Sequence, residues 1–234
     1  MSNVINFRHI TRAFSMSVIL LLSGTFSVSA QEKIAGEEGI YMEGLKEYNV
    51  GSTDKALSIF SSLARKGSRN DAVYYYLSNI YSSKSKPDSA LVMMERAVRL
   101  DPGNTWYRTQ LASLYMNKEQ TGDAIKIYES LRKEYPQQVE LYDGLIDIYV
   151  KEKKLEQALD VLEDIEKYAG KSEASCLTRY NLFIFQNKRD EAIRYLSDFD
   201  KENGTPRTAT ILGDYYTSVQ NDSLAMEYYT KAIS

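Results

Sequence analysis

An alanine recurs at a nearly constant interval along most of the chain, and this recurrence constrains the fold more than any other feature. Five intervals separate the six alanines, four of 34 residues and a last one of 33: Ala56, Ala90, Ala124, Ala158, Ala192 and Ala225. A bulky residue follows each alanine after four positions: Phe60, Met94, Tyr128, Leu162, Leu196 and Tyr229. Residues at this spacing share one face of a helix, so each alanine marks an amphipathic helix.

A second helical stripe precedes each of these helices. Examples are Tyr74, Leu77, Ser78 and Tyr81 before Ala90, and Tyr142, Leu145, Ile146 and Tyr149 before Ala158. Pro102 and Pro136 end the second and third units. Each unit is therefore predicted to be a pair of helices joined by short turns. Because one such pair cannot bury its apolar faces alone, we expect successive pairs to stack into a solenoid.

These columns resemble the tetratricopeptide repeat, most closely over residues 71–104 and 105–138. The resemblance implies an all-α, right-handed solenoid of about six repeats. The expected repeats are 37–70, 71–104, 105–138, 139–172, 173–205 and 206–234, the last of them incomplete.

The chain departs from the family pattern in the fourth and fifth repeats. The small residue of the first helix is kept as Gly44, Ser78, Ala112 and Gly213, but becomes Ile146 and Tyr180 in these two repeats. Arg179 stands where the family has an apolar residue. We therefore expect the fifth repeat to pack differently.

The first thirty residues have the pattern of a secretory signal peptide. Arg8 and Arg12 precede an apolar stretch at 18–22, and Val28-Ser29-Ala30 supplies small residues before a cleavage site. A membrane anchor is the alternative, but serines interrupt the apolar stretch. We predict a signal peptide at 1–30, a short linker at 31–36 and no membrane span in the mature chain. The protein would then lie in the periplasm or cell envelope of a Gram-negative bacterium.

Composition excludes several classes of function. The net charge is −3, and −5 after loss of Arg8 and Arg12, which gives no attraction to nucleic acid. Cleavage would also remove His9, the single histidine, and with it His-dependent nucleophiles and His-ligated zinc. The scattered glycines form no phosphate loop. We therefore expect no enzyme activity, no cofactor and no metal. Cys176 lies on an inward stripe and is expected to be buried.

The family resemblance implies that the first helices line a concave groove, and a second stripe of residues faces it. In the third and fourth repeats this stripe comprises Trp106, Thr109, Ser113 and Met116, then Glu140, Asp143, Asp147 and Val150. Aromatic residues with polar tips are favoured binding anchors, so Tyr41, Tyr75 and Trp106 are candidate ligand contacts. Asn79 also faces the groove. Packing within the core is the alternative for the tyrosines.

Glu140, Asp143 and Asp147 are spaced to share one helical face. Such carboxylates could serve as acid and base for glycoside hydrolysis or gather Ca²⁺. A solvated acidic face is favoured, because nothing nearby in the sequence would raise one pKa or exclude water.

These observations favour a non-catalytic exported scaffold that binds a protein or peptide, as part of a cell-envelope complex. A clamp for a C-terminal carboxylate is not supported, because Asn79 and Asn181 lack matching basic residues. One alternative is a glycan-binding cell-envelope protein. Another is the sensor portion of a longer membrane-bound regulator, since the sequence ends inside a helix and is expected to continue beyond Ser234.

Overall fold

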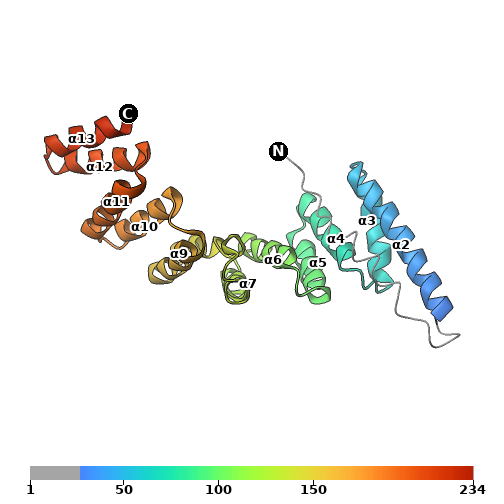
Figure 1. Ribbon diagram of the computed structural model, residues 1–234. Coiled ribbons are helices and arrows are strands. Elements are labelled where there is room, and N and C mark those ends of the chain that lie inside the picture. The colour runs from blue at the N-terminus through green and yellow to red at the C-terminus, as the bar shows by residue number, and fades with distance from the viewer. Residues whose placement is uncertain (1–26, 234) are drawn as a thin grey trace. The chain divides into compact units, whose positions relative to one another are not determined.

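The computed structural model describes residues 27–233, with side chains from residue 36 onward, and contains no strand over these residues (Figure 1). The helices are α2 (Ser27–Asn49), α3 (Thr53–Arg65), α4 (Asp71–Ser83), α5 (Pro87–Leu100), α6 (Thr105–Asn117), α7 (Thr121–Glu134), η1 (Val139–Leu141), α8 (Gly144–Lys151), α9 (Leu155–Ala169), α10 (Glu173–Phe185), α11 (Arg189–Asn203), α12 (Pro206–Ser218) and α13 (Asp222–Ile233).

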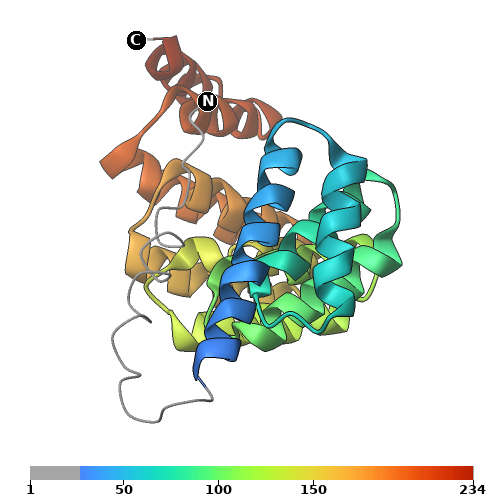
Figure 2. The same ribbon diagram turned by 90° about the vertical axis from the view of Figure 1, so that its right-hand side faces the viewer.

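The described residues divide into two compact units, the first ending at Leu100 and the second beginning at Asp101. In the first, α2 packs against α3 and α4 against α5, and α3 contacts α4. Figure 2 shows α2 and α3 side by side. In the second, the pairs α6 with α7, α8 with α9, α10 with α11 and α12 with α13 follow one another, and each second helix contacts the next first helix. The predicted all-α architecture of stacked helix pairs is thus confirmed.

The turn inside each pair has one recurring geometry. A residue with positive φ follows the first helix at the same place in all six pairs: Gly51, Ser85, Glu119, Lys153, Asn187 and Gln220. The next backbone N–H reaches back five residues, as from Lys86 to the carbonyl of Tyr81 at 2.9 Å. This is the Schellman arrangement, which satisfies the last carbonyls of the helix and stops it.

The alanine column forms the contact between the two helices of a pair. Five of these alanines are fully buried and Ala225 is nearly so. The bulky residue four positions later faces the small residue of the first helix: an added Cβ would lie 2.7 Å from Phe60 at Gly44 and 2.6 Å from Tyr229 at Gly213.

In the fourth and fifth repeats, the larger residue of the first helix faces a leucine of the second helix. Ile146 packs on the core cluster that contains Leu162, and Tyr180 on the cluster that contains Leu196. In both repeats the opposing residue is leucine rather than an aromatic ring. The leucine therefore offsets only part of the volume that Ile146 and Tyr180 add, and these two helix pairs bury larger side chains at this position than the others do.

Arg179 is accommodated by a partner on the preceding repeat. Its Nη2 lies 2.7 Å from Oε2 of Glu166, and the hydroxyl of Tyr195 donates to the other oxygen of Glu166 at 2.8 Å. The guanidinium carbon also lies 5.2 Å from the ring centroid of Tyr195. Cys176 is fully buried, as expected, and burial raises the pKa of its thiol to about 12.

The predicted signal peptide falls mostly on residues 1–26, outside the described residues. Residues 31–36, predicted as a linker, lie within α2 instead. The segment Gln31-Glu32-Lys33 has good helix formers and no proline, so nothing in it stops the helix. Among the described helices, none combines the length and apolar character needed to cross a membrane.

Candidate functional site

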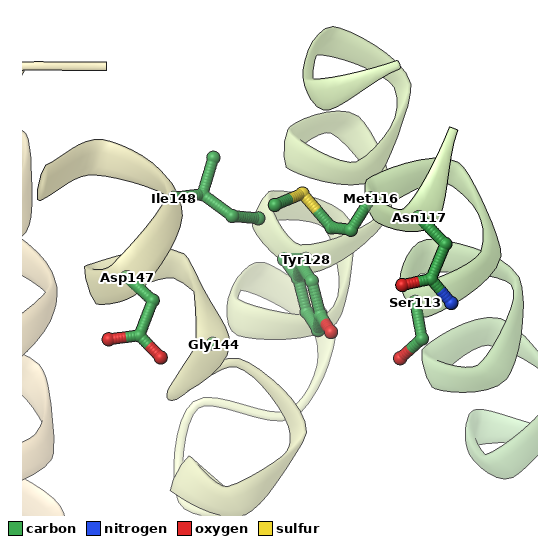
Figure 3. Close-up of a pocket in the computed structure, with 7 residues that line it drawn as sticks. All are labelled: Ser113, Met116, Asn117, Tyr128, Gly144, Asp147 and Ile148. Carbon is green, nitrogen blue, oxygen red and sulfur yellow. The ribbon is translucent and has the colours of Figure 1, made fainter. Parts of the chain in front are cut away.

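A hollow of about 250 Å³ lies among α6, α7 and α8, and we call it the α6–α8 hollow. Its lining residues are Ser113, Met116 and Asn117 of α6, Tyr128 of α7, and Gly144, Asp147 and Ile148 of α8. Figure 3 shows Met116 and Ile148 approaching each other beside the ring of Tyr128. Asp147 lies on one side of that ring, and Ser113 and Asn117 lie on the other. The hollow therefore has an apolar floor and a polar rim.

Gly144 leaves room for Tyr128 at this place. A Cβ atom on Gly144 would lie 3.3 Å from the Tyr128 hydroxyl, tighter than most van der Waals contacts. The ring of Tyr128 also packs on the cluster of Ala112, Ala124 and Ile148. Because these neighbours are small or rigid, the ring is held in place and its polar end stays at the hollow.

The charge around the hollow is negative. None of its seven lining residues is basic, and Asp147 contributes a carboxylate. The pKa of Asp143 is raised above its usual range, first by burial and then by repulsion from Asp147 and Glu140. The expectation that nothing would raise a pKa here was therefore wrong. Burial also raises the pKa of Tyr128, and the charge of Asp143 adds to that effect.

The three acidic residues do not share one regular helix. Glu140 lies in the short 3₁₀ helix η1, Asp143 is the residue before α8, and Asp147 lies within α8. Val139, Asp143 and Gly144 are all weak helix formers, which explains the interruption. Asp143 and Asp147 nevertheless stand four residues apart at the start of α8, so their side chains face the same side of the chain there.

The aromatic candidates fall in different units. Tyr41 is half-buried in the first unit, with its ring centroid 6.0 Å from Phe60 and 6.4 Å from Tyr76, and burial raises the pKa of its hydroxyl. Tyr75 packs edge-on against Tyr76, and Asn79 of α4 is also half-buried. Trp106, in the second unit, is 53% exposed. Tyr41 thus serves packing, whereas Trp106 keeps much of its ring on the surface.

The hollow suits one kind of group. An aliphatic stem can lie on Met116 and Ile148, and a cation at its end can meet Asp147.

The described residues hold no group of three His, Cys, Asp or Glu side chains placed to bind a metal ion.

Sequence reasoning placed Ser113, Met116 and Asp147 on the groove stripe, but it missed four lining residues. Tyr128 belongs to the core column of α7, and Ile148 lies outside the stripe predicted for its helix but is buried against Ala112 and Ala124. The nearby Gly144 was the available signal, because a glycine inside a predicted helix often marks a close approach.

Comparisons with known proteins agree with this architecture. A family model described as tetratricopeptide repeat matches residues 83–147 and 118–175. No curated protein matches the chain.

Several solved structures share the fold. A tetratricopeptide repeat protein from Parabacteroides merdae is 20% identical, with a TM-score of 0.59 over 84% of this chain and 78% of its own. MamA from Desulfovibrio magneticus is 16% identical, with a TM-score of 0.52 over 70% and 93%. YrrB, described as a repeat protein with an unusual peptide-binding site, is 19% identical, with a TM-score of 0.51 over 74% and 90%.

Proposed function

We propose that this chain, which matches the tetratricopeptide repeat family model over residues 83–147 and 118–175, holds a basic peptide segment of a partner protein, since members of that family are generally non-catalytic scaffolds for protein partners. The segment would lie along the first helices α6 and α8, on the concave face that the family uses. A Lys or Arg side chain would enter the α6–α8 hollow. The proposal includes export to the periplasm or cell envelope and no catalytic activity.

The composition of the α6–α8 hollow carries this proposal. Its apolar floor fits the methylene stem of Lys or Arg, and Asp147 with the neighbouring Asp143 and Glu140 provides negative charge. Burial raises the pKa of Asp143 first and repulsion from Asp147 and Glu140 adds to it, and a bound cation would offset that repulsion. The exposed ring of Trp106, on the same helix as Ser113, offers a further apolar contact. The description of YrrB as peptide-binding gives a precedent within the fold.

Fluorescence anisotropy with two labelled peptides tests the proposal. One contains Lys and Leu, and the other has Glu in place of each Lys. We expect tighter binding of the Lys peptide, weakening with salt. Substituting both Asp143→Asn and Asp147→Asn should weaken it by about tenfold or more. The control is Glu163→Gln, which removes an exposed charge from α9. Equal binding of both peptides would contradict the proposal.

Export is tested separately. Expression of the full-length chain in a Gram-negative host, followed by fractionation and intact mass measurement, should give a periplasmic or envelope species that lacks residues 1–30. A species of full mass in the cytoplasm would contradict export without bearing on peptide binding.

A further inference from the structure

A second hollow lies in the first unit and shares no lining residue with the α6–α8 hollow, and we call it the α3–α5 hollow. It has a volume of about 340 Å³. Ser58, Ser61 and Arg65 of α3 line it, with Leu77 and Tyr81 of α4 and Met93 of α5. Leu77 is buried and Met93 is half-buried, so the floor is apolar while the α3 side is polar and basic.

Four polar side chains line this hollow. Across residues 36–233, nothing forms a hydrogen bond or ion pair with the side chains of Ser58, Ser61, Arg65 or Tyr81. Elsewhere in the chain, helical hydroxyls turn back to their own helix, as Ser113 does to the carbonyl of Thr109 at 3.1 Å and Thr178 to that of Ala174 at 2.9 Å. Ser58 and Ser61 do not.

The repeat itself indicates what is missing. Two repeats later, 68 residues on, Tyr149 stands at the place of Tyr81 and Glu129 at the place of Ser61. There, the Tyr149 hydroxyl donates to Oε1 of Glu129 at 2.7 Å. The chain thus provides a carboxylate for this tyrosine in one interface and a short serine in the other.

Residues near Glu129 and Tyr149 also differ from their counterparts at the α3–α5 hollow. Arg132, which binds Asp164 at 2.6 Å and Asp160 at 2.8 Å, corresponds to Ala64. Asp164 corresponds to Arg96, and Asp160 to Val92. Two long charged side chains of α7 are therefore replaced by small ones in α3, which opens the hollow. Asp160 and Asp164 of α9 thus have no acidic counterpart at the matching positions of α5, and Arg65 is the charged residue among those that line the hollow.

We propose that the α3–α5 hollow binds a glutamate side chain of an acidic partner segment. The carboxylate would take the place that Glu129 occupies two repeats later, accepting hydrogen bonds from Tyr81 and Ser61 and pairing with Arg65. The methylene groups of that side chain and an adjacent apolar residue would lie on Leu77 and Met93. Arg65, Lys66 and Arg69, all exposed near the end of α3, complement an acidic segment. This site is independent of the α6–α8 hollow.

Anisotropy measurements on the whole chain test this site, with a labelled peptide of Glu and Leu and a second peptide in which Gln replaces each Glu. We expect the Glu peptide to bind about tenfold more tightly, and Arg65→Glu to remove that preference. Lys133→Glu, which makes the same charge change at the equivalent position of α7, should retain it. Equal binding of the two peptides, binding of neither, or equal losses in the two variants would overturn the proposal.

Ser61→Glu provides an independent test, because it supplies the carboxylate within the chain. We expect this variant to lose binding of the Glu peptide while its melting temperature rises, since Tyr81 and Arg65 gain a partner. A Ser61→Glu variant that still binds the Glu peptide as the parent chain does would overturn the proposal, whatever the outcome for Arg65→Glu.

Discussion

Gly44 lies so close to the ring of Phe60 that a Cβ atom on it would come within 2.7 Å of ring atom Cε1. Phe60 is fully buried and also stacks on Tyr76, with ring centroids 5.4 Å apart. The separation of α2 and α3 is therefore set by the absence of a side chain at one residue.

This contact predicts opposite effects for two substitutions in the same helix. Gly44→Ala should lower the free energy of unfolding by about 1–3 kcal/mol through overpacking, even though alanine favours the helix. Gly39→Ala has nothing within 4 Å and should raise it by about 0.5–1 kcal/mol. Urea unfolding followed by circular dichroism measures both. A stabilised Gly44→Ala variant would contradict the packing described.

The pair of Arg179 and Glu166 predicts a non-additive result. Both side chains are largely buried, so Arg179→Leu leaves a buried carboxylate without its cation and should cost about 3 kcal/mol. The double variant with Glu166→Leu should recover much of that loss, because no uncompensated charge remains. The same unfolding experiment gives the coupling energy. Losses that simply add would show that the pair does not act as a unit.

Glu134 predicts an acid dependence of stability. Hydrogen bonds from Arg108 and Ser130 lower the pKa of its carboxyl to about 2. Because this pKa lies below the unfolded value, the stabilisation is fully present above about pH 4.5 and is lost as the pH falls towards 2. Melting temperatures between pH 6 and pH 2 should therefore fall less steeply in Glu134→Gln than in the parent chain. Glu163→Gln, at an exposed position, serves as the charge-matched control, and equal slopes in all three chains would refute the assignment.

The positive φ angle that recurs in these turns predicts that one substitution lowers the free energy of unfolding and another, at the equivalent position, raises it. Gly51 has a φ of 80° and Lys153 a φ of 59°, in the left-handed region that side chains disfavour. Gly51→Ala should lower the free energy of unfolding by about 1 kcal/mol, and Lys153→Gly should raise it by about 0.5–1 kcal/mol. Thermal unfolding compares each with the parent chain. A destabilised Lys153→Gly variant would show that the lysine side chain itself contributes at this turn.

Much of the fold is readable in the sequence because repeated packing imposes repeated spacing. Each alanine must face the neighbouring helix, so the column from Ala56 to Ala225 reveals the helix pairs directly. The packing of Ile146 on the cluster that contains Leu162 is harder to predict, since only the folded chain shows which side chains meet there. The interruption before Gly144 was likewise missed, because the spacing of Glu140, Asp143 and Asp147 also suits a continuous helix.

The sequence by itself determined the all-α helix pairs, their period and the inward columns, because these depend on side-chain size and spacing along one chain. Tertiary structure alone decided where hollows open, because a hollow depends on which side chains of three helices meet. Tyr128 lines the α6–α8 hollow because its ring packs next to Gly144, which has no side chain. Ser61 lines the α3–α5 hollow because α3 and α4 bring it to the same place as Tyr81. Side-chain contacts and hollows depend on how several helices pack together, so they cannot be read from one repeated position of the sequence.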